Sequence, residues 1–201
     1  MKLYYSPGAC SLSPHIALRE GGFTFEMEKV DLRAKVTASG TDFRAINAKG
    51  SVPAFVTDDG DVLTEGPAIV QYIADQAPGT ELAPHAGTIE RYRLMEWLNF
   101  ITSELHKGFS PLFKPTTPED YKPVARGLLE DRFTWVDAQL AEKQYLLGDH
   151  FTVADGYLFV ILTWAEKMKF DLPRWPSLNS YYARVRARPK VQEALEAEAK
   201  G

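Results

Sequence analysis

The chain opens MKLYYSPGACSLSPHIALREGG (1–22), and this stretch decides the fold. The apolar run Leu3–Tyr5 is typical of a short buried strand, and the Ser-Pro-Gly that follows ends it. A helix is predicted over residues 11–20, with Ser11 as candidate N-cap, a proline in the first turn and a Gly-Gly pair at the end. The only cysteine, Cys10, therefore lies between a strand and the start of a helix.

The segments that follow predict the rest of one small α/β domain. FTFEMEKVDL (23–32) alternates well enough for a second strand, and TDFRAIN (41–47) allows only a short helix. VPAFVTDDGDVLTE (52–65) contains two short strands around an Asp-Gly turn, and GPAIVQYIADQ (66–76) is typical of a helix. The order β-α-β-α-β-β-α over residues 1–77 predicts a thioredoxin-like fold.

The second half of the chain predicts helices alone, in an all-α domain (87–201) joined by a linker (78–86). TIERYRLMEWLNFITSELHK (88–107) carries apolar residues at helical spacing. They are Ile89, Leu94, Leu98, Ile101 and Leu105. The four prolines of GFSPLFKPTTPEDYKP (108–123) predict a loop, after which helical periodicity resumes over 124–142. One apolar helix within 146–168 and two helices separated at Pro189 complete the domain.

The charge pattern argues against nucleic acid as a partner. The 201 residues have a formal net charge of −4, and no face-wide basic block is present. The basic run RVRARPK (184–190) is followed by acidic EALEAEAK, and we interpret it as a solvated helix surface.

The chain also carries no signal for secretion or membrane insertion. A proline and a glycine interrupt its start before an apolar core could form, and YLFVIL (157–162) is far short of the ~20 residues of a spanning helix. One cysteine allows no internal disulfide. We therefore expect a cytoplasmic protein without membrane association and without a metal site.

Cys10 stands where thioredoxin-like proteins carry a Cys-x-x-Cys pair, but here the sequence reads Cys-Ser-Leu-Ser. Without a resolving cysteine, a dithiol oxidoreductase is not expected. A helix N-terminus offers unpaired N–H groups that favour a thiolate, and such sites lower a cysteine pKa from ~8.5 toward ~6 or below. The alternative is a buried, inert cysteine.

Two further features fit the same site. In KGSVPAF (49–55), a cis proline at position 53 would place the backbone of Val52 beside the thiol, where it could pair with an extended peptide. The alternative is an ordinary trans proline at a strand start. In Thr64–Pro67, Gly66 offers a helix N-terminal N–H to a carboxylate and Glu65 an acid to an ammonium, which together suit an α-amino acid head group. A plain helix cap is the alternative there.

FTVADGYLF (151–159) predicts a structural motif. Thr152 and Asp155 form a capping box, preceded by the apolar residue Phe151. The staple partner would fall at Gly156, so we expect an intact box, a weak staple and a role in folding.

These features occur in the order and spacing of a glutathione transferase. The chain resembles the bacterial beta class along its whole length, in five segments. They are KLYYSPGACSLSPHIALRE (2–20), KGSVPAF (49–55), LTEGPAIVQYIAD (63–75), RYRLMEWLNFITSELHKGFSPLF (91–113) and GDHFTVADGYLF (148–159). Several long matches in one order across two domains make the resemblance specific.

The resemblance implies roles for the matching residues. Cys10 would form a mixed disulfide with glutathione, and His106 would lie near the thiol as a second catalytic residue. The glutathione-binding residues would be Tyr5, Ser11, Lys35, Val52, Pro53, Glu65, Gly66, Glu104 and Lys107, with the partner subunit's Asn99 and Ser103. Among them, Val52 would meet the cysteinyl part, Glu65 and Gly66 the γ-glutamyl head and Lys35 the glycyl carboxylate; Tyr5 and Ser11 are secondary candidates. The substrate pocket would draw on Phe109, Leu112, Phe113 and Trp164.

The residues themselves leave part of this open. Asn99, Ser103 and His106 share one stripe of a helix, and a polar stripe is usually solvated, although Trp97 and Phe100 beside it fit a subunit interface better. A lone histidine is more often structural.

The resemblance implies an enzyme of detoxification, a homodimer that adds the glutathione thiolate to a small hydrophobic electrophile with glutathione as co-substrate. One alternative is a glutathione-dependent thiol-disulfide reductase, peroxidase or reductive dehalogenase in which Cys10 attacks and glutathione resolves. Another is a non-enzymatic binding protein of the same fold. Retention of Cys10, Val52-Pro53 and Glu65-Gly66 argues against the latter. The sequence does not identify the electrophile.

Overall fold

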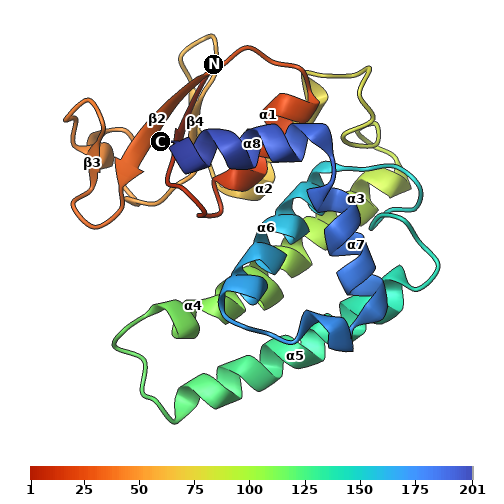
Figure 1. The fold of residues 1–201 in the computed structure, drawn as a ribbon. Coiled ribbons are helices and arrows are strands. Elements are labelled where there is room, and N and C mark those ends of the chain that lie inside the picture. The colour runs from red at the N-terminus through yellow and green to blue at the C-terminus, as the bar shows by residue number, and fades with distance from the viewer. Residues whose placement is uncertain (201) are drawn as a thin grey trace.

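The computed structural model describes residues 1–200, and its first half is built on a five-stranded mixed sheet (Figure 1). The strands are β1 (Lys2–Tyr5), β2 (Glu26–Asp31), β3 (Val36–Thr37), β4 (Ala54–Val56) and β5 (Val62–Thr64), in the spatial order β3-β2-β1-β4-β5. β1 and β2 are parallel and are joined by α1 (Leu12–Glu20), whereas the other neighbours are antiparallel. This is the thioredoxin-like arrangement predicted from the sequence.

The alternation of side chains along β1 divides the domain into two apolar layers. Leu3 points to the face covered by α1 and α2 (Gly66–Asp75), where it joins the main core of the molecule. Tyr4 points to the opposite face and packs with Val30 and with Phe43 of the short 3₁₀ helix η1 (Phe43–Ala45). Both faces of the strand are therefore buried, which explains its continuous apolar sequence.

The strand β3 could not be predicted from the sequence pattern. β3 has only two residues and pairs with the end of β2 through Val30 and Thr37. Two residues are too few to show an alternation, so β3 is detectable only through its pairing.

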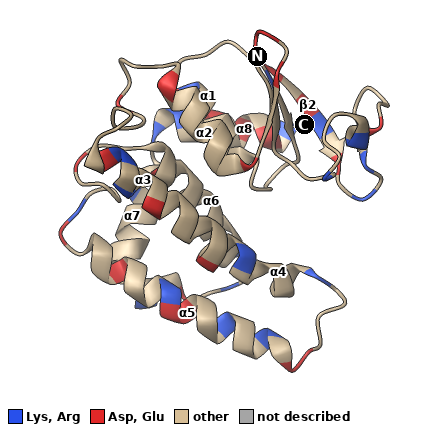
Figure 2. Cartoon of the chain, turned by 180° about the vertical axis from the view of Figure 1, so that it is seen from behind, with Lys and Arg blue, Asp and Glu red and all other residues tan. Residues whose placement is uncertain are grey.

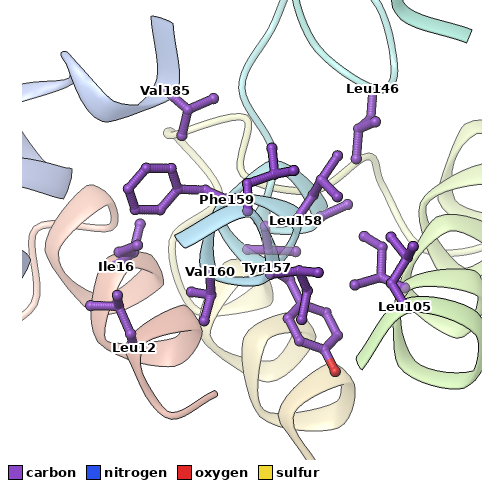
Figure 3. Packing of buried hydrophobic residues seen from close by; sticks show 14 of the residues in the cluster. Leu12, Ile16, Leu105, Leu146, Tyr157, Leu158, Phe159, Val160 and Val185 are labelled. Atoms are coloured by element: carbon purple, nitrogen blue, oxygen red, sulfur yellow. The ribbon is translucent and has the colours of Figure 1, made fainter. Parts of the chain in front are cut away.

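The second half consists of helices. They are α3 (Ile89–Phe100), the π-helical η2 (Ile101–His106), α4 (Lys107–Phe113), α5 (Tyr121–Leu140), α6 (Val153–Lys167), the 3₁₀ helix η3 (Leu172–Arg174), α7 (Pro176–Arg186) and α8 (Pro189–Lys200). α6 is the central helix and is buried almost all round (Figure 3). Its side chains meet Leu12 and Ile16 of α1, Leu105 of η2 and Val185 of α7 in one core, which joins the two halves of the chain.

Two expectations about the second half are wrong. The segment 108–123 is not all loop, because most of α4 and the start of α5 lie within it. Pro111 removes only one N–H from the short α4, and Pro123 lies in the first turn of α5, where the N–H has no helical partner. Ile89 is 64% exposed at the first position of α3, whereas the apolar residues that follow it at helical spacing are buried.

The C-terminal helix returns to the first half of the chain. In Figure 1, α8 runs alongside α1, next to the sheet. Arg188, which precedes α8, donates to both carboxylate oxygens of Glu20 at 2.7 and 2.9 Å, and its guanidinium lies 4.2 Å from the ring centroid of Phe151. The interpretation of 184–190 as a solvated surface is therefore wrong for Arg188, although Arg186 is exposed and pairs with Glu166.

The capping box at the start of α6 is confirmed. Thr152 and Asp155 exchange the predicted hydrogen bonds, and Asp155 also accepts from the backbone N–H of Leu146 at 2.9 Å. Gly156 offers no side chain to Phe151, whose ring instead lies edge-on to Tyr145.

Charges of both signs are interspersed over the helices and strands (Figure 2). Within residues 1–200, no helix combines the length and apolarity needed to cross a membrane.

Candidate active site

A cavity of about 610 Å³ lies where the two halves of the chain meet. Its walls come from the loop between β1 and α1, the segment before β4, the start of α2, the η2–α4 junction and α6. The sequence had singled out each of the first three segments, and folding brings them to one place.

Cys10 lines this cavity and is partly buried. Its Sγ donates to the carbonyl oxygen of Val52 at 3.3 Å, and the Val52–Pro53 peptide bond is cis, which is one of the two alternatives that the sequence left open. Burial raises the pKa of the Cys10 thiol to about 11, against the lowering effect of its own N–H, the N–H of Ser11 and the charge of Lys107. The prediction of a lowered pKa is therefore wrong for this structure, because desolvation outweighs the helix N-terminus.

The start of α2 forms the candidate seat for an amino acid head group. Glu65 has φ +69°, which a residue with a side chain rarely adopts, and it lies at the N-cap of α2 next to Gly66. Its carboxylate accepts from the ammonium of Lys49 at 2.5 Å, and that ammonium also donates to Thr64 Oγ1 at 2.7 Å. Within the described residues the N–H of Gly66 has no partner, so an acceptor and a donor stand side by side at the cavity wall.

Lys35 lines the same cavity from the turn between β2 and β3. Its φ is +60°, and its ammonium donates to the carbonyl oxygen of Gly50 at 2.8 Å. That single bond leaves two of its three hydrogens available, so Lys35 is a cation that a carboxylate in the cavity could contact.

His106 stands at the end of η2, on the wall formed by the helical half. Its Nδ1 is 2.6 Å from the hydroxyl of Tyr157 on α6, and its ring lies edge-on to Trp164 with 4.9 Å between the centroids. Burial, aided by the charge of Lys107, lowers the pKa of His106 to about 4, so the imidazole is neutral at pH 7. π-helical turns such as η2 recur at functional sites.

The apolar part of the cavity wall is aromatic. Phe113 of α4 and Trp164 of α6 line it, with their ring centroids 5.3 Å apart and their planes nearly perpendicular. Phe109 does not line it, because its side chain is fully buried behind Trp164, and Leu112 packs against the core instead. Of the four predicted substrate-pocket residues, Phe113 and Trp164 thus line this cavity, whereas Phe109 and Leu112 do not.

Comparison with known proteins shows which family the chain belongs to. The model of the glutathione S-transferase N-terminal domain matches residues 8–76, and that of the C-terminal domain matches residues 100–189. A glutathione S-transferase GstA of Escherichia coli O157:H7 is 48% identical over 198 residues, which cover 98% of each chain. The chain belongs to the glutathione transferase family. The prediction of this family, and of its two-domain fold, is confirmed.

Solved structures narrow the class of this transferase. A sphingomonad glutathione S-transferase complexed with glutathione is 46% identical over the whole of both chains, with a TM-score of 0.97. A beta class enzyme of Sphingomonas chungbukensis is 47% identical over 98% of each chain, with a TM-score of 0.96. The predicted resemblance to the bacterial beta class is confirmed.

Tyr5, Ser11 and Glu104 do not line this cavity, and neither do Asn99 and Ser103, which the sequence analysis assigns to the site of the partner subunit. Tyr5 belongs to the main core, and the Ser11 hydroxyl is occupied with the backbone of Ser6, so neither of these secondary candidates lines the cavity. Asn99 and Ser103 bond back to carbonyls of their own helix, and Glu104 accepts from Arg132 at 2.9 Å.

Other residues that line the cavity were not predicted from the sequence. Lys49 faces Glu65, but a lysine before a Gly-Ser turn carries no signal of its own. Tyr157 and Thr102 line the cavity from helices whose patterns predict only core packing. Within residues 1–200 no cluster of three or more His, Cys, Asp or Glu side chains could hold a metal ion.

Proposed function

We propose that this chain conjugates the thiolate of glutathione to hydrophobic electrophiles in the cavity between its two halves, and that Cys10 can form a mixed disulfide with glutathione. The observation that carries the proposal is the set of groups around the cavity. Glutathione has two carboxylates, one ammonium and one thiol, and the cavity offers Lys35, Glu65 and the free N–H of Gly66 around Cys10.

Each part of the tripeptide has a matching group. The γ-glutamyl head would displace Lys49 from Glu65 and place its carboxylate at the N-terminus of α2. The cysteinyl part would pair with the backbone of Val52, whose N–H has no partner within the described residues. The glycyl carboxylate would contact Lys35.

The electrophile would lie against the aromatic wall. Phe113 is 43% exposed in this structure, so an apolar ligand stacked on it and on Trp164 would bury surface that is otherwise in water. Holding the electrophile next to the thiolate would supply much of the rate gain.

The protein would act as a homodimer in which the partner subunit's Asn99 and Ser103 complete the site. The support is the continuity of one exposed stripe on α3 and η2. Tyr92 is 58% exposed and Met95 36%, and they precede Asn99 and Ser103 on the same side. Apolar side chains left open next to polar ones are typical of an interface.

The thiol of Cys10 supports a second activity. With a mixed disulfide of glutathione and another thiol, the thiolate of Cys10 would attack the glutathione sulfur, the disulfide bond would break, and the other thiol would leave as thiolate while glutathione remains bound to Cys10. The thiolate of a second glutathione would then attack the sulfur of the bound glutathione, release glutathione disulfide and regenerate the thiol of Cys10. This is the step that a glutathione-dependent reductase or dehalogenase would use.

One experiment separates the two activities. Conjugation of 1-chloro-2,4-dinitrobenzene and the glutathione-dependent reduction of a mixed disulfide of glutathione and 2-hydroxyethanethiol would be followed in the Cys10→Ala variant and in the unchanged protein. We expect conjugation to survive, because the raised pKa of Cys10 makes it a poor thiolate at pH 7. We expect thiol exchange to be lost, because alanine has no sulfur to form the mixed disulfide. Loss of both activities would assign conjugation to Cys10. Absence of conjugation in the unchanged protein, together with no binding to immobilised glutathione, would contradict the proposal and favour a binding protein.

We also propose a division of function along the chain and a cellular location for the protein. The functional division is a glutathione-binding domain over 1–77, a linker over 78–86 and a helical domain over 87–201, supported by the end of α2 at Asp75 and the start of α3 at Ile89. A reducing, cytoplasmic location is supported by the single free cysteine at the site.

A further inference from the structure

The contact between His106 and Tyr157 is short, and the position of its hydrogen decides what His106 can do. Nδ1 of His106 and the hydroxyl oxygen of Tyr157 are 2.6 Å apart. In Figure 3, the Tyr157 hydroxyl extends from α6 to the edge of the apolar cluster. Either group could donate in principle, because a neutral imidazole carries its hydrogen on one of two nitrogens.

The neighbouring hydroxyl settles the direction. Thr102 donates its own hydrogen to the carbonyl oxygen of Leu98 at 2.8 Å, so its oxygen is left as an acceptor. That oxygen is 3.5 Å from Tyr157, too far for a good O–H···O bond. Tyr157 keeps its hydrogen at pH 7 because burial raises the pKa of its hydroxyl. Among the described protein atoms, Nδ1 of His106 is therefore the one good acceptor within reach of the Tyr157 hydrogen.

The other ring nitrogen then carries the proton. With its Nδ1 lone pair taken, a neutral His106 must bear its hydrogen on Nε2. Within residues 1–200 no fully buried side-chain nitrogen or oxygen lacks a partner, and no bond joins Nε2 to the protein. Nε2 is therefore accessible, and since His106 lines the cavity, its N–H is open to a ligand there.

We propose that Tyr157 is a positioning residue that holds His106 as the Nε2–H tautomer, so that His106 offers the cavity a hydrogen-bond donor and no basic lone pair. His106 would then stabilise the thiolate of bound glutathione and would not remove its proton. The thiolate part of this inference depends on the proposed function, whereas the tautomer does not.

The electrostatic surroundings are consistent with this assignment. The positive charge of Lys107, next to His106 in the chain, disfavours protonation of the imidazole, whereas the negative charge of Glu65 favours it. The other ionisable side chains along the cavity wall are Cys10, Lys35, Lys49, Tyr157 and Lys167. A neutral donor next to Lys107 favours an anionic sulfur between them.

The first test reads the tautomer directly. The protein would be labelled with ¹⁵N-histidine, and long-range ¹H–¹⁵N spectra would be recorded without ligand from about pH 5.5 to pH 8, a range that spans the usual histidine pKa. Among the four histidines, His106 would be assigned by its loss in His106→Gln. We expect the Nε2–H pattern throughout. An Nδ1–H pattern, or a titration midpoint near neutral pH, would overturn the proposal.

The second test reads the effect on the ligand. The pKa of the thiol of bound glutathione would be measured from thiolate absorbance in the unchanged protein, His106→Ala, Tyr157→Phe and the double variant. We expect Tyr157→Phe to raise this pKa and to lower kcat/KM about fivefold at pH 6.5, the size of one ordinary hydrogen bond. The double variant should match His106→Ala, because Tyr157 acts only through His106. Additive effects would mean that Tyr157 acts by another route.

A matched control removes a buried hydroxyl elsewhere. In Tyr182→Phe the lost group bonds Glu166 on the far side of α6, outside the cavity, so the thiol pKa should not change. If the unchanged protein holds no glutathione thiolate at any pH, the thiolate part fails with the proposed function, and the spectra still decide the tautomer.

Discussion

The carboxylate of Glu198, near the end of α8, accepts a hydrogen bond from the backbone N–H of Gly8 at 2.9 Å, across 190 residues of chain. Its other oxygen lies 3.1 Å from Nδ1 of the fully buried His15. Because Arg19 donates to Nε2 of His15 at 2.8 Å, the hydrogen of a neutral His15 is on Nδ1 and is donated to Glu198. Gly8 has φ +69° in the loop that leads to Cys10, so the last helix holds the backbone next to the thiol.

We expect Glu198→Gln to lower the free energy of unfolding by about 1.5–3 kcal/mol, the range for a hydrogen bond to a charged group. The amide offers one acceptor where two donors, Gly8 and His15, must be satisfied. Urea unfolding followed by tryptophan fluorescence measures the change. The control is Glu193→Gln on the exposed side of the same helix, where no measurable loss is expected. Equal stability of the two variants would contradict this role of Glu198.

Asp155 illustrates a carboxylate that an amide cannot replace. One oxygen accepts from Leu146 N–H and the Tyr181 hydroxyl, and the other accepts from Thr152. Either orientation of an asparagine would turn an NH₂ group toward a backbone N–H. We expect Asp155→Asn to cost roughly 2–4 kcal/mol in thermal or urea unfolding, because buried donors lose their acceptor. Asp149→Asn, in the exposed loop before α6, is the matched control and should unfold like the unchanged protein.

Most local features of this fold could be predicted from the sequence. The strands β1 and β2, the Asp-Gly hairpin of β4 and β5 and the capping box depend on neighbours in the chain, and they lie where the pattern predicts them. Cys10 and Val52 could be placed together because the thioredoxin-like order of elements brings their segments to one sheet edge.

Features that depend on distant segments could not be predicted in this way. The thiol pKa of Cys10 depends on how much of the chain covers it, and its local helix N-terminus suggested the opposite direction. The pairing of Arg188 with Glu20 spans 168 residues and has no local signal. Tyr157 lies in an apolar helix, so its pattern indicates core, although its hydroxyl reaches the cavity.

The raised pKa of Cys10 predicts a pH profile for alkylation without glutathione. Since its folded pKa is about 11, the thiolate is scarce at pH 7 and becomes abundant only as pH rises through that value. We expect the rate with iodoacetamide, followed by mass spectrometry, to be below that of free glutathione at pH 7. It should rise about tenfold per pH unit up to pH 9, since each unit below the pKa raises the thiolate fraction tenfold. A rate that levels off near pH 6 or 7 would show that the helix N-terminus prevails over burial.

The exposed stripe on α3 and η2 predicts how the site depends on assembly. If the partner subunit's Asn99 and Ser103 complete the glutathione site, a charge placed earlier in the stripe should weaken the dimer and lower glutathione affinity together. Met95→Arg would introduce that charge at a position that is 36% exposed, so the fold of the subunit should tolerate it. We expect the dimer dissociation constant from sedimentation equilibrium to rise at least about tenfold, the effect of losing one anchor residue of an interface. The KM for glutathione should rise as the protein is diluted below that constant.

Ala183→Arg on the exposed side of α7 controls for the added charge and should leave both quantities unchanged. A monomeric unchanged protein with full activity would contradict the shared site, and an intact dimer in Met95→Arg would place the interface elsewhere.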